Sequence, residues 1–163
     1  MTRLCAYLFL IFLLIPAASA ASVTITPTGI DPGDTITVNI QDLPNGAAFS
    51  FSILGEFDVT PGERFTFTAR DLTLPFSLGS GEVSAYTRGT DWTGLTMQSE
   101  DFTVTLGGSA ENGEFRKTQA YNISSGTYEA VSLEGWAAPS ADSIIAEVTM
   151  RGTKTGPDDG TIS

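Results

Sequence analysis

Apolar and polar residues alternate along most of the chain beyond its N-terminal segment. The stretch from Thr35 to Ile40 is typical, because three apolar residues alternate there with Thr and Asn after the turn residues Pro32 and Gly33. The same order of turn, acidic residue and Thr-rich strand returns at 60–68. No window of useful length has the apolar period of about 3.6 residues that marks an amphipathic helix. The alternation therefore predicts half-buried strands of antiparallel sheets.

Turn signals separate these runs about every 8–12 residues, which is the spacing of a β-sandwich. Pro75 places one run at an edge or a bend, because proline cannot donate a hydrogen bond to a sheet. We expect about seven short strands, at 22–26, 35–40, 48–53, 64–69, 72–78, 82–87 and 101–106. This part of the chain predicts an all-β fold built as an antiparallel sandwich.

The C-terminal third of the chain has a less regular pattern. Residues 107–113 are rich in Gly and polar residues, which is typical of a linker. Residues 109–163 offer about three or four further strands; a helix is an alternative at 141–150, but its β-branched residues favour a strand. We therefore expect a sandwich over 21–106, followed by a C-terminal β extension or a small second module. The last four residues resemble the start of a strand that could pair with a partner.

Residues 1–20 predict an export signal. Arg3 is followed by an apolar run from Leu4 to Ile15, and Ala18-Ser19-Ala20 has the small residues of a cleavage site. The run is shorter than the roughly 20 apolar residues of a transmembrane helix, although an uncleaved N-terminal anchor is an alternative. No second apolar segment follows, so we expect a secreted or cell-surface protein without a transmembrane segment after cleavage.

Composition and charge exclude several kinds of chemistry. The chain has 19 acidic and 8 basic residues, a net charge of −11, no His and a single cysteine, Cys5, which cleavage would remove. His-based triads, thiol chemistry and disulfides are then excluded, and the acidic balance argues against nucleic acid and anionic membranes as partners. A glycosidase-like pair of carboxylates remains an alternative, but Glu56, Asp58 and Glu63 look like turn and surface residues. We therefore expect that the protein is not an enzyme.

Acidic turns make calcium the metal to consider, because calcium prefers about six to eight oxygen ligands. Asp31 and Asp34 flank one turn, and Asp158 and Asp159 lie together in a second, glycine-flanked loop. Neither turn has the regular ligand spacing of a known calcium loop, and Asp and Gly are also ordinary turn residues. Calcium is thus an alternative to a purely structural role for these turns, and no other cofactor is expected.

One modification site is predicted from a short motif. Asn122-Ile123-Ser124 is an N-glycosylation sequon, and the Ser and Gly that follow it predict an accessible loop. Short sequons also occur by chance, so glycosylation of Asn122 depends on both export and exposure.

Two tryptophans are the candidates for ligand binding. Trp92 lies within 88–94 and Trp136 within 134–139, and both segments look like loops because they contain Gly or Pro. An exposed aromatic ring beside polar side chains can stack on the apolar face of a sugar ring. The alternative is structural, with each Trp plugging one end of the sandwich.

The beginning of the expected sandwich resembles a known family. Val23-Thr24-Ile25-Thr26-Pro27 precedes Pro32-Gly33-Asp34-Thr35-Ile36-Thr37-Val38, and together they resemble the opening pattern x-P-x-x-x-x-P-G-D-x-V-x-V of immunoglobulin-like modules in prokaryotic surface proteins. The acidic, Thr-rich composition resembles secreted proteins of archaea, methanogens in particular. The resemblance covers 22–106 and implies an immunoglobulin-like sandwich in a cell-surface or extracellular protein. Such modules share no catalytic residues, so the resemblance implies none here.

These observations lead to two hypotheses for the function. The first is a structural or adhesive component of the cell envelope, which associates with other extracellular proteins or with itself through sheet edges and Thr-rich faces. The second is a carbohydrate-binding module that uses Trp92 and Trp136 as platforms for a polysaccharide. Exposed rings on one surface would favour the second hypothesis, and buried rings would count against it.

Overall fold

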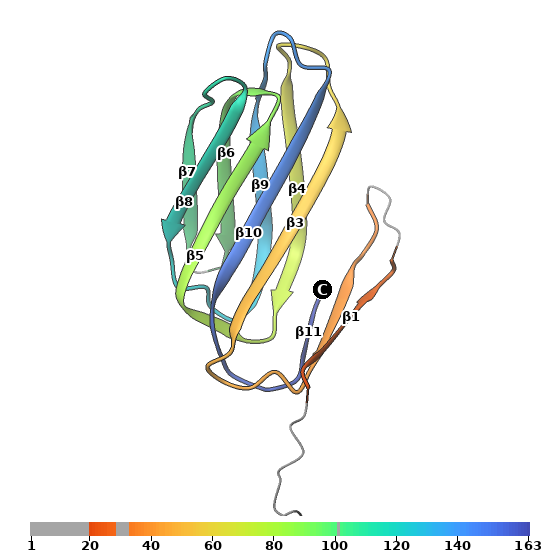
Figure 1. The fold of residues 1–163 in the computed structure, drawn as a ribbon, viewed down its shortest axis with the longest axis vertical. Helices are drawn as coiled ribbons and strands as arrows, with labels where there is room; N and C mark the ends of the chain where they lie inside the picture. The colour runs from red at the N-terminus through yellow and green to blue at the C-terminus, as the bar shows by residue number, and fades with distance from the viewer. Residues whose placement is uncertain (1–19, 29–32, 101) are drawn as a thin grey trace, which may run out of the picture.

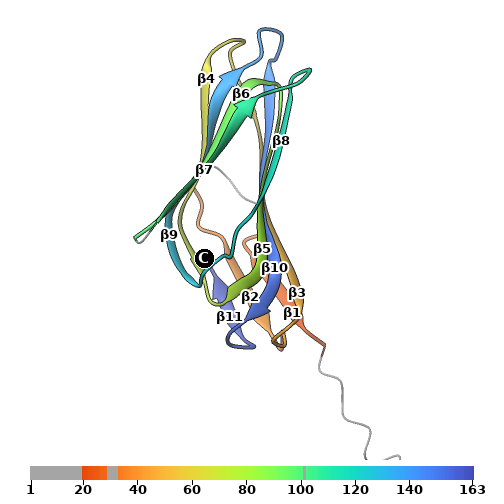
Figure 2. The same cartoon turned by 90° about the vertical axis from the view of Figure 1, so that its left-hand side faces the viewer.

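The computed structural model describes residues 20–28, 33–100 and 102–163, and every element within them is a β-strand. Two four-stranded sheets face each other, and a small three-stranded sheet lies at one end (Figures 1 and 2). The predicted export signal, apart from Ala20, and the candidate calcium ligand Asp31 lie outside the described residues. The strands in chain order are β1 (Ser22–Thr26), β2 (Thr37–Gln41), β3 (Ala48–Asp58), β4 (Arg64–Leu74), β5 (Ser77–Arg88), β6 (Thr90–Ser99), β7 (Thr103–Ser109), β8 (Glu114–Ala120), β9 (Gly126–Ala137), β10 (Ser143–Thr155) and β11 (Gly160–Ile162).

Pairing between distant strands defines the topology. Sheet I has the order β3-β10-β5-β8, sheet II has the order β4-β9-β6-β7, and the small sheet has the order β1-β2-β11. The pairs β3/β10, β4/β9, β5/β8 and β6/β7 are nested in the sequence, as in one long hairpin whose tip is the β6–β7 turn. When such a hairpin rolls up, β10 also pairs with β5 and β9 with β6, which gives an eight-stranded jelly roll.

The predicted fold class, an all-β antiparallel sandwich, is confirmed. The strand order differs from the ABED and CFG order of an immunoglobulin-like sandwich. The motif that carries that resemblance falls on β1 and β2, which belong to the small sheet and not to the two main sheets. A turn followed by an alternating strand specifies local structure, and it is compatible with more than one strand order.

The C-terminal residues complete both main sheets, so the predicted division of the chain does not match the structure. β9 lies between β4 and β6, and β10 lies between β3 and β5. The linker predicted at 107–113 is wrong for residues 107–109, which end β7. Gly108 allows a ring from sheet I to pack closely, because a β-carbon there would lie 3.2 Å from Cε2 of Phe115. Of the strands within residues 114–163, β8, β9 and β10 therefore belong to the sandwich itself, and β11 belongs to the small sheet.

In β10 the apolar alternation correctly predicted which side chains face the core. The choice of strand over helix at 141–150 is confirmed, since β10 covers most of this range and buries alternate residues. Rings from the two sheets meet in the core: Phe57 of sheet I stacks on Phe67 of sheet II with their centroids 6.1 Å apart. Burying one large apolar side chain contributes roughly 1.5–3 kcal/mol. The buried apolar residues of β10 are Ile144, Ala146, Val148 and Met150.

Tyr128 of β9 is a buried polar side chain at the opposite end of the core from the β5–β6 connection. Its hydroxyl donates a hydrogen bond of 3.1 Å to the backbone oxygen of Ser124, and its ring packs against the edge of Phe102. Burial, and to a lesser extent the neighbouring Tyr121, raises the pKa of Tyr128 to about 12. The phenol therefore stays neutral well above ordinary pH and holds the β8–β9 connection against the core.

A single residue, Gly89, joins β5 of sheet I to β6 of sheet II. Its φ is +85°, and a β-carbon there would collide with the backbone oxygen of Ser143. Beside this crossing, the fully buried hydroxyls of Thr87, Thr90 and Thr93 bond to one another at 2.8, 2.7 and 3.2 Å. Each of the three hydroxyls finds a partner within the cluster, so the chain changes sheets here without leaving them unpaired.

We expect Gly89→Ala to destabilise the fold more than Gly62→Ala. Both glycines have positive φ, +85° and +76°, and a side chain in this backbone region costs about 1–2 kcal/mol. A β-carbon at Gly62 has open space around it, so that variant isolates the backbone cost. Urea unfolding should give a larger loss for Gly89→Ala, by roughly 1–3 kcal/mol. Equal losses for the two variants would contradict a tight crossing at Gly89.

Candidate functional site

Trp92 and Trp136 lie side by side on the outer face of sheet II. Trp92 is in β6, Trp136 is in β9, and the two residues are direct partners across this antiparallel pair. Direct partners point to the same face, with β-carbons about 4.5–5.5 Å apart. Their exposed fractions are 39% and 48%, so neither ring plugs the end of the sandwich. The structure thus brings both predicted ligand-binding residues together on one open surface.

Both tryptophans lie in strands, and the predicted loops around them are wrong. Trp92 is the third residue of β6, and Trp136 is the penultimate residue of β9. Gly94 and Gly135 occupy strand positions, whereas Gly89 is the single residue that joins β5 to β6. At Gly135 a β-carbon would collide with the backbone oxygen of Trp92 and would also lie 2.8 Å from the ring of Phe65. Close packing against the neighbouring strand and an aromatic ring, and not a turn, explains this glycine.

The indole of Trp92 lies over two glycines. A β-carbon at Gly94, the next residue on this face of β6, would lie 2.7 Å from Cη2 of Trp92. Gly107 of β7, the direct partner of Gly94, would place its β-carbon 3.3 Å from Cζ2 of the same ring. An aromatic ring over a strand glycine covers the bare backbone, as designed sheets also exploit. The six-membered ring of the indole therefore packs close to the sheet backbone, while 39% of Trp92 stays exposed.

Trp136 has charged neighbours. Arg64 of β4 is its direct partner on the other side, and the guanidinium carbon lies 5.5 Å from the centroid of the indole. Arg64 also pairs with Glu134, with 3.5 Å between Nη2 and Oε2. Both charged side chains are exposed, so this ion pair adds little stability. Its position matters more, because it places a hydrogen-bond donor and an acceptor beside the ring.

Hydroxyl groups form a row across the middle of the same face. Thr68, Ser132, Thr96 and Thr105 are successive partners on β4, β9, β6 and β7. The hydroxyls of Thr68 and Ser132 lie 2.9 Å apart and share a hydrogen bond. A hydroxyl can both donate and accept. The outer face of sheet II therefore combines an aromatic pair, an ion pair and a row of hydroxyls, all on strands.

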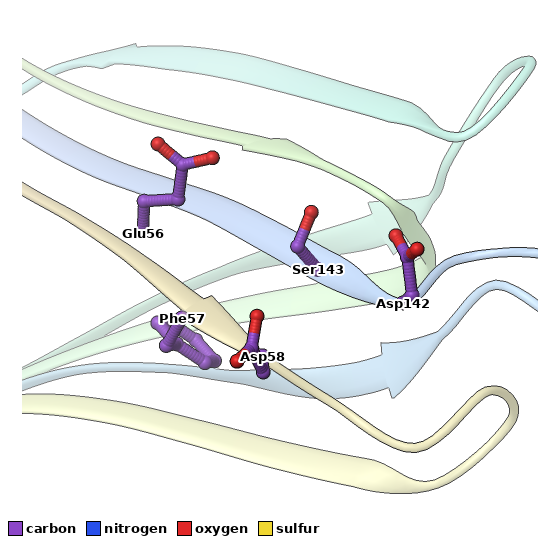
Figure 3. A pocket seen from close by; sticks show the side chains of 5 residues that line it. All are labelled: Glu56, Phe57, Asp58, Asp142 and Ser143. Atoms are coloured by element: carbon purple, nitrogen blue, oxygen red, sulfur yellow. The ribbon is translucent and has the colours of Figure 1, made fainter.

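A concavity of about 530 Å³ on the outer side of sheet I collects two of the three carboxylates considered for catalysis. Glu56 and Asp58 line it together with Asp142, but Glu63 does not. Figure 3 shows the three carboxylates spread along β3 and the start of β10 instead of meeting at one point. An acidic pair that worked on one glycosidic bond would have to flank it. The expectation that the protein is not an enzyme stays a prediction.

Three of the four predicted calcium ligands, Asp34, Asp158 and Asp159, lie in the described residues. Asp158 pairs with the fully buried Lys154, with 3.3 Å between Oδ1 and Nζ. Asp159 accepts a hydrogen bond of 2.8 Å from the backbone N–H of Asp42. Asp34 precedes β2. In the described part of the chain, no group of three or more acidic side chains is arranged to hold a metal ion, and calcium binding stays a prediction.

The sequon lies at the surface. Asn122 and Ser124 are exposed in the connection between β8 and β9, while Ile123 between them is buried. The side-chain oxygen of Asn122 accepts a hydrogen bond of 3.5 Å from the backbone N–H of Gly81. The side chain is thus accessible, and glycosylation of Asn122 stays a prediction.

The chain matches no known family of proteins and no curated protein. Among the residues that the structure describes, no helix is long and apolar enough to cross a membrane. The function therefore has to be argued from the surface geometry of this chain.

A substitution at Gly94 should lift the indole of Trp92 off the sheet. In a Trp136→Phe background, where Trp92 is the one remaining tryptophan, we expect Gly94→Ala to red-shift the fluorescence and to increase quenching by acrylamide. Thr96→Ala, one position further along the same face of β6, is the matched control and should change neither. If Gly94→Ala left the fluorescence unchanged, the indole could not rest on this glycine.

Proposed function

We propose that the protein is an extracellular, non-catalytic module that binds polysaccharide through the outer face of sheet II. The observation that carries this proposal is the exposed pair Trp92 and Trp136 on adjacent strands. Sugar rings have apolar faces of C–H groups, and stacking on an indole buries these faces. Hydroxyl groups at the sugar rim can then bond to Arg64, Glu134 and the hydroxyl row.

The rigidity of this surface supports the proposal. β9 and β6 are the two inner strands of sheet II, so each tryptophan has a strand neighbour on both sides. Trp92 has the two glycines beneath it, and Trp136 has Arg64 beside it. Side chains that are already ordered lose little conformational entropy on binding. An ordered, open face suits the surface of an extended polymer better than it suits a small ligand, which usually needs a deeper pocket.

Charge indicates the kind of polysaccharide. The net charge of −11 disfavours polymers of uronic acids or sulfated sugars, because like charges repel. We therefore expect a neutral polymer. Jelly rolls include lectin domains, but this is an analogy between folds, and a fold alone does not determine a function.

The proposal narrows the adhesive role that the sequence favoured. Adhesion to a polysaccharide needs only one exposed face, and export rests on the pattern of residues 1–20. The strand at 160–163, predicted to seek a partner, already has neighbours on both sides. β11 pairs with β2, and the backbone oxygen of Ser163 accepts a hydrogen bond of 2.8 Å from Thr73 of β4. Association through this strand is therefore not part of the proposal.

We expect Trp92→Ala and Trp136→Ala each to weaken binding to a neutral polysaccharide at least about tenfold, which corresponds to ~1.4 kcal/mol. The measurement is depletion of the exported chain from solution by insoluble cellulose, chitin or β-1,3-glucan. Leu54→Ala is the matched control, because Leu54 is 63% exposed on the outer face of sheet I. Its loss should leave binding unchanged.

Unfolding in urea separates loss of binding from loss of fold. Trp136→Ala should keep almost all of its stability, whereas Trp92→Ala also uncovers Gly94 and Gly107 and is expected to lose somewhat more. The proposal would be wrong if the wild-type chain bound none of the three polymers, or if folded tryptophan variants bound as well as wild type.

A further inference from the structure

β1 is an edge strand that carries no charged side chain. It pairs with β2 on one side and, within the described residues, has no strand on the other. All five of its residues are exposed, and none is charged. Natural edge strands are commonly protected by charged residues, a bulge or a covering loop, because their free backbone groups can pair with another chain. Figure 1 shows β1 at the outer side of the small sheet, away from the two main sheets.

The edge strands of the main sheets differ from β1 in this respect. β3 carries Glu56 and Asp58 near its end, and β8 carries Glu114, Arg116 and Lys117. β4 is charged as well, and β11 approaches its C-terminal part. β7 has no charged residue, but the ammonium of Lys117 donates a hydrogen bond of 3.0 Å to Gly107 at its edge. The described part of the chain thus leaves β1 as its least protected edge.

The apolar side chains of β1 continue the apolar face of the small sheet, but they are exposed to solvent. Val23 and Ile25 are the direct partners of Ile40 and Val38 on β2 and therefore share their face. The two residues of β2 are buried, with exposed fractions of 1% and 6%, whereas Val23 and Ile25 are exposed by 56% and 51%. The apolar face of the small sheet thus runs outward from the core and ends uncovered at β1.

We propose that β1 pairs antiparallel with β1 of a second copy of this chain, across a two-fold axis at Thr24. In this register Val23 lies opposite Ile25 of the second copy, and Ile25 lies opposite its Val23. Each copy therefore adds two β-branched side chains to the uncovered apolar face of the other. Ser22, Thr24 and Thr26 then meet their counterparts on the opposite face, where hydroxyl pairs are favourable.

Charge favours contact between two copies at an uncharged edge strand such as β1 over contact at a charged surface. Two molecules that each carry a net charge of −11 repel each other. An uncharged strand is the place where they can approach with the smallest local repulsion. The pairing would join two three-stranded sheets into one continuous sheet and would give each dimer two tryptophan faces. Two faces on one particle raise the avidity for a polymer even without a new contact to the sugar.

A cysteine at the two-fold axis tests the register. Cys5 lies in the predicted signal, so the exported chain, which contains every strand, has no cysteine of its own. We expect Thr24→Cys to form a covalent dimer under mild oxidation, because directly opposite strand residues lie within the range of disulfide geometry. Thr105→Cys on β7, the uncharged edge strand of sheet II, is the matched control and should stay monomeric at the same dilute concentration.

Sedimentation of the unmodified chain is the second, independent test. The wild-type chain should shift from monomer to dimer as its concentration rises, Ile25→Val should behave in the same way, and Ile25→Lys should remain monomeric. Because Ile25 is half exposed, none of these substitutions should prevent folding. A wild-type chain that stays monomeric throughout, equal association of Ile25→Lys, or no preference for the cysteine at Thr24 would each overturn the proposal. Loss of polysaccharide binding would not affect it, since the two surfaces are separate.

Discussion

The nested pairing of distant strands is the constraint on which the rest of this structure depends. β9 and β10 come late in the sequence, but each lies between two strands from earlier in the chain and is an inner strand of one sheet. Neither main sheet is complete without them. This explains why the chain has no division into modules, and why one surface combines residues as distant as Arg64, Trp92 and Trp136.

Glycine has a role in this architecture that differs from its usual role in turns. Gly89 lets the chain cross from one sheet to the other in a single residue, while Gly94 and Gly107 leave room for an indole on the outer face. The missing β-carbon thus lets the chain change sheets at Gly89, and it lets an indole ring pack against the backbone at Gly94 and Gly107. The strand residues beneath the Trp92 indole have no side chains, so the ring can lie close to the backbone there. Two cross-strand partners, Gly94 and Gly107, thus shape the proposed binding face.

Local pattern predicted the strands, and it could not predict their partners. The alternation of Ile144, Val148 and their neighbours was enough to identify β10 and its buried face. β10 lies inside sheet I because it pairs with both β3 and β5. The alternation of residues within β10 does not determine which strands it pairs with. Gly107 and Gly108 were assigned to a linker because composition does not show that rings pack on them. The tryptophans could be named as candidates from the sequence, but their adjacency follows from the β6/β9 register alone. One local signal was available: Trp92 and Gly94 are two residues apart and would share a face in a strand.

The central claim is that the outer face of sheet II, and no other surface, receives a neutral polysaccharide. The most direct test is to titrate the isotope-labelled chain with soluble oligosaccharides of a polymer that it binds and to follow its amide and indole NMR signals. Our account predicts that the largest shifts fall on the indole N–H groups of Trp92 and Trp136 and on the amides of β6 and β9. The outer face of sheet I, with its concavity around Glu56 and Asp142, should not respond. Shifts centred on that concavity, with both indoles unchanged, would contradict the account.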